Sequence, residues 1–172
     1  MPLIEARETE VYGDFETTEE WRAWVLAGAG GLAVAAAGAL GAPEAEAVRP
    51  FGAAYGVAGL LRASGVLASQ GSCLLPHDLL RRHGVSPEAF IHDPGSEPAR
   101  AALLDVVREG QALLAEARRI AVPRMAVAAV LPAVLARRDL ARWPDVAIPR
   151  RMGDRLAVTV AGMTGAGLTS AG

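Results

Sequence analysis

The sequence has little that could form covalent cross-links or a thiolate metal site. Its single cysteine, Cys73, cannot form a disulfide within the chain, and no CxxC pair or His/Cys cluster accompanies it. His77 follows four residues later and could act as a base for a cysteine nucleophile, but Pro76 interrupts a helix that would hold both. A buried structural cysteine is the favoured interpretation. This cysteine usage fits a reducing compartment such as the cytoplasm.

Lysine is absent, so arginine supplies all 17 basic residues, and the formal net charge is −2. Affinity for a phosphate backbone comes from clustered cations, so this balance argues against a nucleic-acid partner. The first ten residues, MPLIEARETE, are acidic, whereas a secretory or mitochondrial targeting segment is basic. We therefore expect a cytoplasmic protein that binds no nucleic acid.

Aromatic residues make up only 5% of the sequence, although 52% is hydrophobic. Alanine and leucine supply most of the apolar surface, and the β-branched and aromatic enrichment that is typical of strands is missing. The apolar residues recur with helical periodicity throughout. A chain of 172 residues with this composition can bury one core. The sequence therefore predicts an all-α fold in one domain.

The predicted domain covers residues 17–168, between an acidic lead-in of residues 1–16 and a disordered tail of residues 169–172. The first 20 residues hold seven acids and one arginine. Thr17 and Glu20 form an S/T-x-x-E pattern, which predicts that the first helix starts there. Residues 23–43 carry no charge and could span a membrane by length alone. Their alanine and glycine give a weak drive for insertion and suit close helix packing, which favours a buried helix of a soluble protein.

Proline, glycine and apolar periodicity predict the remaining helices. They begin at Glu44 with a break at Pro50, at Pro76, at Ser86, at Ser96, at Pro123 with a kink at Pro132, and at Arg151. Residues 118–155 contain nine arginines and three aspartates, a net charge of +6. Solvated helix ends would explain this charge. The sharper alternative is a docking surface for anionic lipid head groups or an acidic partner, and hence a peripheral membrane contact.

The stretch of residues 51–84 organises the chain. It contains a glycine-punctuated helix in which Tyr55 and Arg62 fall at helical spacing, followed by the helix that starts at Pro76. Glycine in such a helix lets a neighbouring helix or a ligand approach the backbone closely. An arginine within an apolar run should be paired or should face a pocket. Arg62 and Tyr55 are therefore the candidate pocket or ligand-binding residues, and no residue is predicted to be catalytic or to bind a metal.

The same stretch resembles the central motif of the squalene and phytoene synthase family. That motif reads roughly Q-L-T-N-I-L-R-D-x-x-x-D and is followed by G-R-x-Y-L-P, where this chain has GVAGLLRASGVL and then GSCLLP. Leu61, Arg62, Gly71, Leu75 and Pro76 match the family's residues. The positions of the two aspartates, which hold magnesium ions against the substrate diphosphate in that family, are Ala63 and Leu67 here. The positions of the family's glutamine, asparagine and second arginine are Gly56, Gly59 and Ser72.

A closer resemblance is to a divergent branch of that family, which includes the mitochondrial complex I assembly factor related to phytoene synthase. The branch motif has the form L-P-x-D-L-x-x-H-G-V-S-x-E-x-F, and LPHDLLRRHGVSPEAF at residues 75–90 follows it almost position by position. The resemblance covers the whole chain but only the C-terminal part of the family's usual domain. The family's first aspartate-rich motif would lie upstream.

The resemblance implies a helical bundle of the isoprenoid-synthase type whose metal motif has degenerated. Alanine and leucine cannot supply the hard oxygen ligands that magnesium needs, so no cofactor is expected. The favoured function is a non-catalytic assembly or scaffold protein, with a prenyl chain or another lipid in the inherited cavity. The alternative is an active head-to-head prenyltransferase that uses magnesium. The expected partner is a second copy, or a chain that supplies the helices of the family's N-terminal portion.

Overall fold

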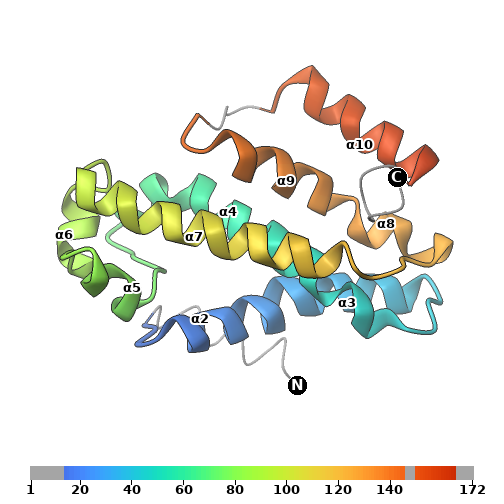
Figure 1. Cartoon of the computed structure of the whole chain (residues 1–172), viewed down its shortest axis with the longest axis horizontal. Coiled ribbons are helices and arrows are strands. Elements are labelled where there is room, and N and C mark those ends of the chain that lie inside the picture. The colour runs from blue at the N-terminus through green and yellow to red at the C-terminus, as the bar shows by residue number, and fades with distance from the viewer. Residues whose placement is uncertain (1–13, 146–149, 166–172) are drawn as a thin grey trace.

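The computed structural model describes residues 14–145 and 150–165, and every regular element within these ranges is a helix. The predicted all-α fold is confirmed. Figure 1 shows an elongated bundle in which α7 (Glu97–Ala117) crosses α4 (Arg49–Ser69), with α2 (Thr18–Val25) and α3 (Gly31–Ala39) along one side and α9 (Pro132–Arg142) and α10 (Met152–Thr164) along the other. The predicted tail and most of the predicted lead-in lie outside the described residues.

The first helix begins as predicted but is not continuous. The Thr17 hydroxyl accepts a hydrogen bond from the backbone of Glu20, and the Glu20 side chain accepts one from the backbone of Thr17, which completes the capping box. Between α2 and α3 the chain forms one π-helical segment, η1 (Leu26–Gly30). The uncharged stretch predicted as one buried helix therefore contains a bulge, and much of α3 is exposed.

The end of the predicted acidic lead-in packs against the bundle. Phe15 is buried, and its ring lies 4.8 Å from that of Trp24. Its carbonyl accepts a hydrogen bond from the backbone of His77, and the carbonyl of Glu16 accepts one from Asp78. Residues 14–16 thus attach the start of α2 to the start of α5 (His77–Arg82).

The central helix α4 follows a short 3₁₀ segment, η2 (Ala45–Val48), and runs for 21 residues. Pro50 lies in its first turn, where a missing N–H costs nothing, so the predicted break there is a helix start. α4 buries residues on several faces and packs against α7, α9 and η1. The helix that carries the family-like motif is therefore the core of the bundle.

The remaining elements follow the predicted punctuation closely. They are α6 (Pro87–His92), which Ser86 caps, α7, the segment η3 (Arg124–Ala126) with α8 (Val127–Val130), α9 and α10. Pro132 is the first residue of α9, so the chain breaks between α8 and α9 at the position of the predicted kink. The apolar pattern predicts that the helix from Arg151 runs to about Gly167, but α10 ends at Thr164, because the φ of 72° at Gly165 lies in the left-handed region.

Candidate functional site

A groove of about 580 Å³ runs between α4 and the bulged helix α2–η1–α3. Its volume lies within the range of about 300–1,000 Å³ that is usual for small-molecule sites. The residues that line it are mostly apolar or lack a side chain: Trp24, Val25, Gly28, Ala29, Leu32, Tyr55, Gly56, Gly59, Leu60, Arg62, Ala63, Leu67, Leu74 and Arg150. The groove is open to solvent along part of its length, since Leu32 and Tyr55 are exposed.

The glycines of α4 determine where the groove closes and where it opens. At Gly52 a Cβ atom would lie 2.5 Å from the carbonyl oxygen of Ala29, and at Gly56 it would lie 2.5 Å from the Cβ of Ala29. These two glycines therefore let η1 press against α4 and close the groove floor. One turn further on, a Cβ at Gly59 would meet nothing within 4 Å, so this glycine leaves open space in the groove.

The π-helical segment forms the opposite wall. A π-bulge frees a backbone carbonyl, and here the Nη1 atom of Arg49 donates a hydrogen bond of 2.9 Å to the carbonyl of Leu26. The Nε and Nη2 atoms of Arg49 donate to Glu46, which fixes its orientation. The bulge turns Gly28 and Ala29 toward α4, where both line the groove. Bulges of this kind are frequent at functional sites.

Two arginines and one aspartate form the polar part of the groove wall. Asp139 of α9 is buried, and its Oδ1 atom lies 3.5 Å from Nη1 of Arg62 and 3.1 Å from Nη1 of Arg150. Its Oδ2 atom lies 2.9 Å from the same nitrogen of Arg150 but accepts no hydrogen bond from the described residues. Two guanidinium groups thus lie within ion-pair distance of one carboxylate at the edge of an apolar groove. Guanidinium groups are also suited to bind carboxylates and phosphates.

Both candidate residues from the sequence lie on this groove. Arg62 is 16% exposed, so it is both partly buried and ion-paired, and Tyr55 lies two helical turns earlier on the same wall. Sequence reasoning missed Asp139 and Arg150, which come from a different part of the chain. An acid within the arginine-rich segment 118–155 was the available signal, but it did not indicate a partner on α4.

A second buried carboxylate, Asp154, fastens α10 to α9 and lies outside the groove. Its Oδ1 atom accepts hydrogen bonds from Arg138 at 2.7 Å and Arg142 at 2.9 Å, and its Oδ2 atom accepts one from the backbone of Arg151. The Arg138 hydrogen bond, with those from Arg151 and Arg142, lowers the pKa of Asp154 to about 2. These contacts join the start of α10 to α9, which is a structural role.

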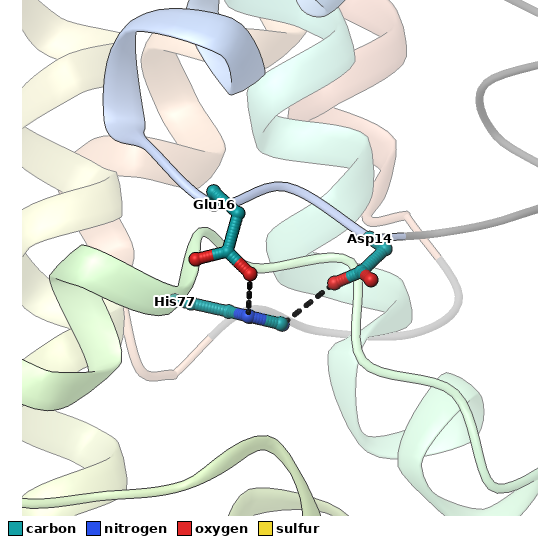
Figure 2. Close-up of side chains that lie close together, drawn as sticks. All are labelled: Asp14, Glu16 and His77. Carbon is teal, nitrogen blue, oxygen red and sulfur yellow. Dashed lines mark ion pairs between the residues drawn. The ribbon is translucent and has the colours of Figure 1, made fainter.

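Asp14, Glu16 and His77 also come together, and the sequence did not predict it (Figure 2). The two imidazole nitrogens of His77 lie 3.1 Å from Asp14 and 3.3 Å from Glu16. Both carboxylates are mostly exposed, and the backbone hydrogen bonds of the same segment already join it to α5. Ion pairs that hold residues 14–16 in place explain this cluster.

Cys73 is not placed for nucleophilic chemistry. Burial raises the pKa of its thiol, which disfavours the reactive thiolate. The imidazole of His77 is directed toward Asp14 and Glu16 (Figure 2). The interpretation of Cys73 as a structural residue stays a prediction that these observations favour.

The sequence profile of the squalene/phytoene synthase family matches residues 1–144. The chain belongs to this family. No curated protein and no solved structure matches it significantly. The match spans η1, α4 and α9, so every residue that lines the groove except Arg150 lies in the family domain, and α10 lies beyond the matched residues.

Family membership implies a magnesium site on the central helix, and the residues present do not fit one. Ala63 and Leu67 stand at the two aspartate positions of the family motif and both line the groove. Neither offers an oxygen ligand, and magnesium binds through hard oxygen donors. The metal positions of this motif are therefore apolar groove wall in this chain.

Two helical stretches are long and apolar enough to cross a membrane by length and composition. They are Thr18–Ala39, with 22 residues, and Ala45–Ser69, with 25 residues, both with a mean hydropathy of 1.3. The core helices of soluble proteins pass the same test, and α4 contacts helices on several sides. Length and composition therefore do not distinguish a membrane-spanning helix from a buried core helix in these two stretches.

Proposed function

We propose that this family member is non-catalytic and binds a long-chain lipid with an anionic end in the groove along α4, in an assembly or scaffold role. The observation that carries the proposal is the position of Ala63 and Leu67, which face the groove where the family motif places its metal-binding aspartates. Ionisation of a prenyl diphosphate needs metal ions to neutralise the leaving group. A groove of ligand-binding size whose wall lacks these metal ligands supports binding without that reaction.

The chemistry of the lining supports the choice of ligand. Leu32, Leu60 and Leu67 offer apolar surface to a hydrocarbon chain, and burial of each methylene contributes about 0.8 kcal/mol. Arg62 and Arg150 line the groove with guanidinium groups, which bind carboxylates and phosphates. A prenyl diphosphate or a fatty acid would satisfy both features. We infer that this binding requires no magnesium.

The assembly role rests on the likeness of residues 75–90 to the branch that contains the complex I assembly factor. In the structure this segment forms α5, the turn through Gly84 and the start of α6. Leu79, Leu80 and Phe90 are buried, so most of the motif supports the fold. Its exposed residues, among them Arg81, Arg82 and Glu88, would be the ones that a protein partner reads.

The test is titration of the purified protein with farnesyl diphosphate, followed by tryptophan fluorescence and by an assay for released pyrophosphate. Trp24 lines the groove, so occupancy should change its emission. We expect saturable binding that is unchanged by EDTA, with no pyrophosphate release when magnesium is added. Release of pyrophosphate at an enzymatic rate would establish the alternative, an active head-to-head prenyltransferase.

A matched pair of variants on α4 locates the binding site. In Gly59→Phe the new ring enters open groove space, whereas in Gly65→Phe it enters open space outside the groove. We expect Gly59→Phe to abolish the fluorescence change and Gly65→Phe to leave it intact, with equal melting temperatures. Equal binding by both variants would show that the lipid does not occupy this groove.

A further inference from the structure

The large apolar side chains of α10 face solvent, whereas a surface helix usually turns such side chains toward the core. Met152, Leu156, Val160 and Met163 are 76%, 62%, 46% and 82% exposed. Their spacing of four, four and three residues places them in one stripe along the helix. The opposite face, which packs toward the bundle, carries the smaller residues Ala157, Val158 and Ala161.

The charges around this stripe have one sign. Asp154 is the single acid of α10, and it is buried against Arg138 and Arg142. The exposed charged residues beside the stripe are Arg151 and Arg155. There are six arginines and two aspartates in α9, α10 and the two residues before α10. Both aspartates are buried and form ion pairs.

We propose that the stripe Met152–Leu156–Val160–Met163 with Arg151 and Arg155 is a docking surface for an anionic lipid membrane. An interfacial helix places its apolar face at the boundary of the acyl chains while its arginines contact the lipid head groups. Methionine side chains are flexible and adapt to an irregular apolar surface. Figure 1 shows α10 along the outer edge of the bundle beyond α9, where a flat surface can reach it.

The charge pattern favours a membrane over a second copy of the chain at this surface. Pairing two α10 stripes would place Arg151 and Arg155 of both copies at the edges of the contact, and α10 offers no exposed carboxylate to neutralise them. An anionic lipid surface supplies negative charge wherever the arginines lie. The inference stands apart from the proposed function, because it uses neither the groove nor its ligand.

The experiment is sedimentation of the full chain with vesicles of phosphatidylcholine alone or of phosphatidylcholine mixed with phosphatidylglycerol. We expect binding to the anionic vesicles, weakened by high salt, and much weaker binding to the neutral ones. In Leu156→Gln/Met163→Gln the partition coefficient should fall about tenfold or more, since two apolar side chains no longer leave water. In Arg151→Gln/Arg155→Gln it should fall to that of neutral vesicles.

The matched control is Leu104→Gln/Arg100→Gln, which changes an exposed leucine and an exposed arginine on α7. This variant should bind anionic vesicles as the unaltered chain does, and circular dichroism should show equal helix content in all variants. Equal binding by the α10 variants and the unaltered chain would overturn the proposal. It would also be overturned if the chain failed to sediment with anionic vesicles, or if the α10 substitutions instead abolished self-association in solution.

Discussion

The glycines of α4 differ in whether a side chain would fit at their positions, and the unfolding free energy of alanine variants measures this difference. A Cβ at Gly52 would lie 2.5 Å from the carbonyl oxygen of Ala29 and 2.6 Å from the Cβ of Ala33, so Gly52→Ala must push two helices apart. We expect a loss of about 1–3 kcal/mol of unfolding free energy from this overpacking. Thermal or urea unfolding followed by circular dichroism measures it.

The control lies in the same helix. A Cβ at Gly65 would meet nothing within 4 Å, so Gly65→Ala adds no clash and removes the helix penalty of glycine. It should raise the unfolding free energy by roughly 0.5–1 kcal/mol. If both alanines shifted stability in the same direction, the close contact of η1 with α4 would not be the reason for Gly52.

Asp154 makes stability depend on acid pH. Hydrogen bonds from Arg138, the Arg151 backbone and Arg142 lower its pKa from 3.8 to about 2 in the folded chain. A carboxyl with a depressed folded-state pKa contributes stability that is full above its unfolded pKa and is lost as the pH falls through the folded pKa. The window for Asp154 therefore runs from about pH 4 down to about pH 2.

We expect Asp154→Asn to lower the unfolding free energy at neutral pH by on the order of 1–2 kcal/mol, because both arginines lose their counter-charge while remaining partly solvated. The difference between the variant and the unaltered chain should shrink as the pH falls through this window. Melting curves at a series of pH values check it. A difference that stayed constant down to the lowest pH would mean that the carboxylate charge is not what stabilises α10.

At the scale of helices, the Arg62–Asp139–Arg150 cluster connects α4 to α9 and to the segment just before α10, since Arg150 lies two residues before Met152. In Arg62→Met, Asp139 keeps Arg150, whose Nη1 atom lies 2.9 Å away, so the buried carboxylate stays paired. The methionine also retains the apolar stem that lines the groove. We expect a melting temperature within a few degrees of the unaltered chain, and binding of farnesyl diphosphate weakened about tenfold by the loss of a charged contact.

Tryptophan fluorescence titration and thermal melting of the same samples separate the two effects. A large drop in melting temperature with unchanged binding would make Arg62 a structural residue. Asp139→Asn is the companion variant, because it leaves two arginines beside the groove without their carboxylate. It should destabilise the fold more than Arg62→Met does.

Local sequence signals predicted the helices well because their causes are local. Thr17 and Glu20 complete one capping box, and Pro50 and Pro132 occupy first turns. Arg62 and Tyr55, the candidate pocket or ligand-binding residues, both line the groove, and a ligand-binding role for them stays a prediction.

What the sequence did not predict depends on long-range contacts. The bulge at η1 needs Arg49 to reach the carbonyl of Leu26, 23 residues earlier. Arg62 meets Asp139 across 77 positions of sequence, and His77 meets Asp14 across 63. No periodicity or capping rule encodes these pairs, because each depends on how the helices pack.

At the scale of the whole molecule, one apolar side of α3 is not covered by the other described helices. Only 22% of the residues in the most apolar window of Thr18–Ala39 are buried, and Ala35, Ala36 and Ala39 are exposed. Small residues let two helices approach closely, and uncovered apolar surface tends to attract a partner. We therefore propose that two copies associate through α3, the alternative being a chain that supplies further helices.

Light scattering coupled to size-exclusion chromatography at micromolar concentration should give the mass of a dimer. Ala35→Glu/Ala39→Glu places two carboxylates on the same face of α3 and should yield monomers, because like charges would meet across the contact. Ala112→Glu/Ala115→Glu changes two exposed alanines of α7 and should leave the mass unchanged. A monomer that unfolds cooperatively without either substitution would show that these helices close a core unaided.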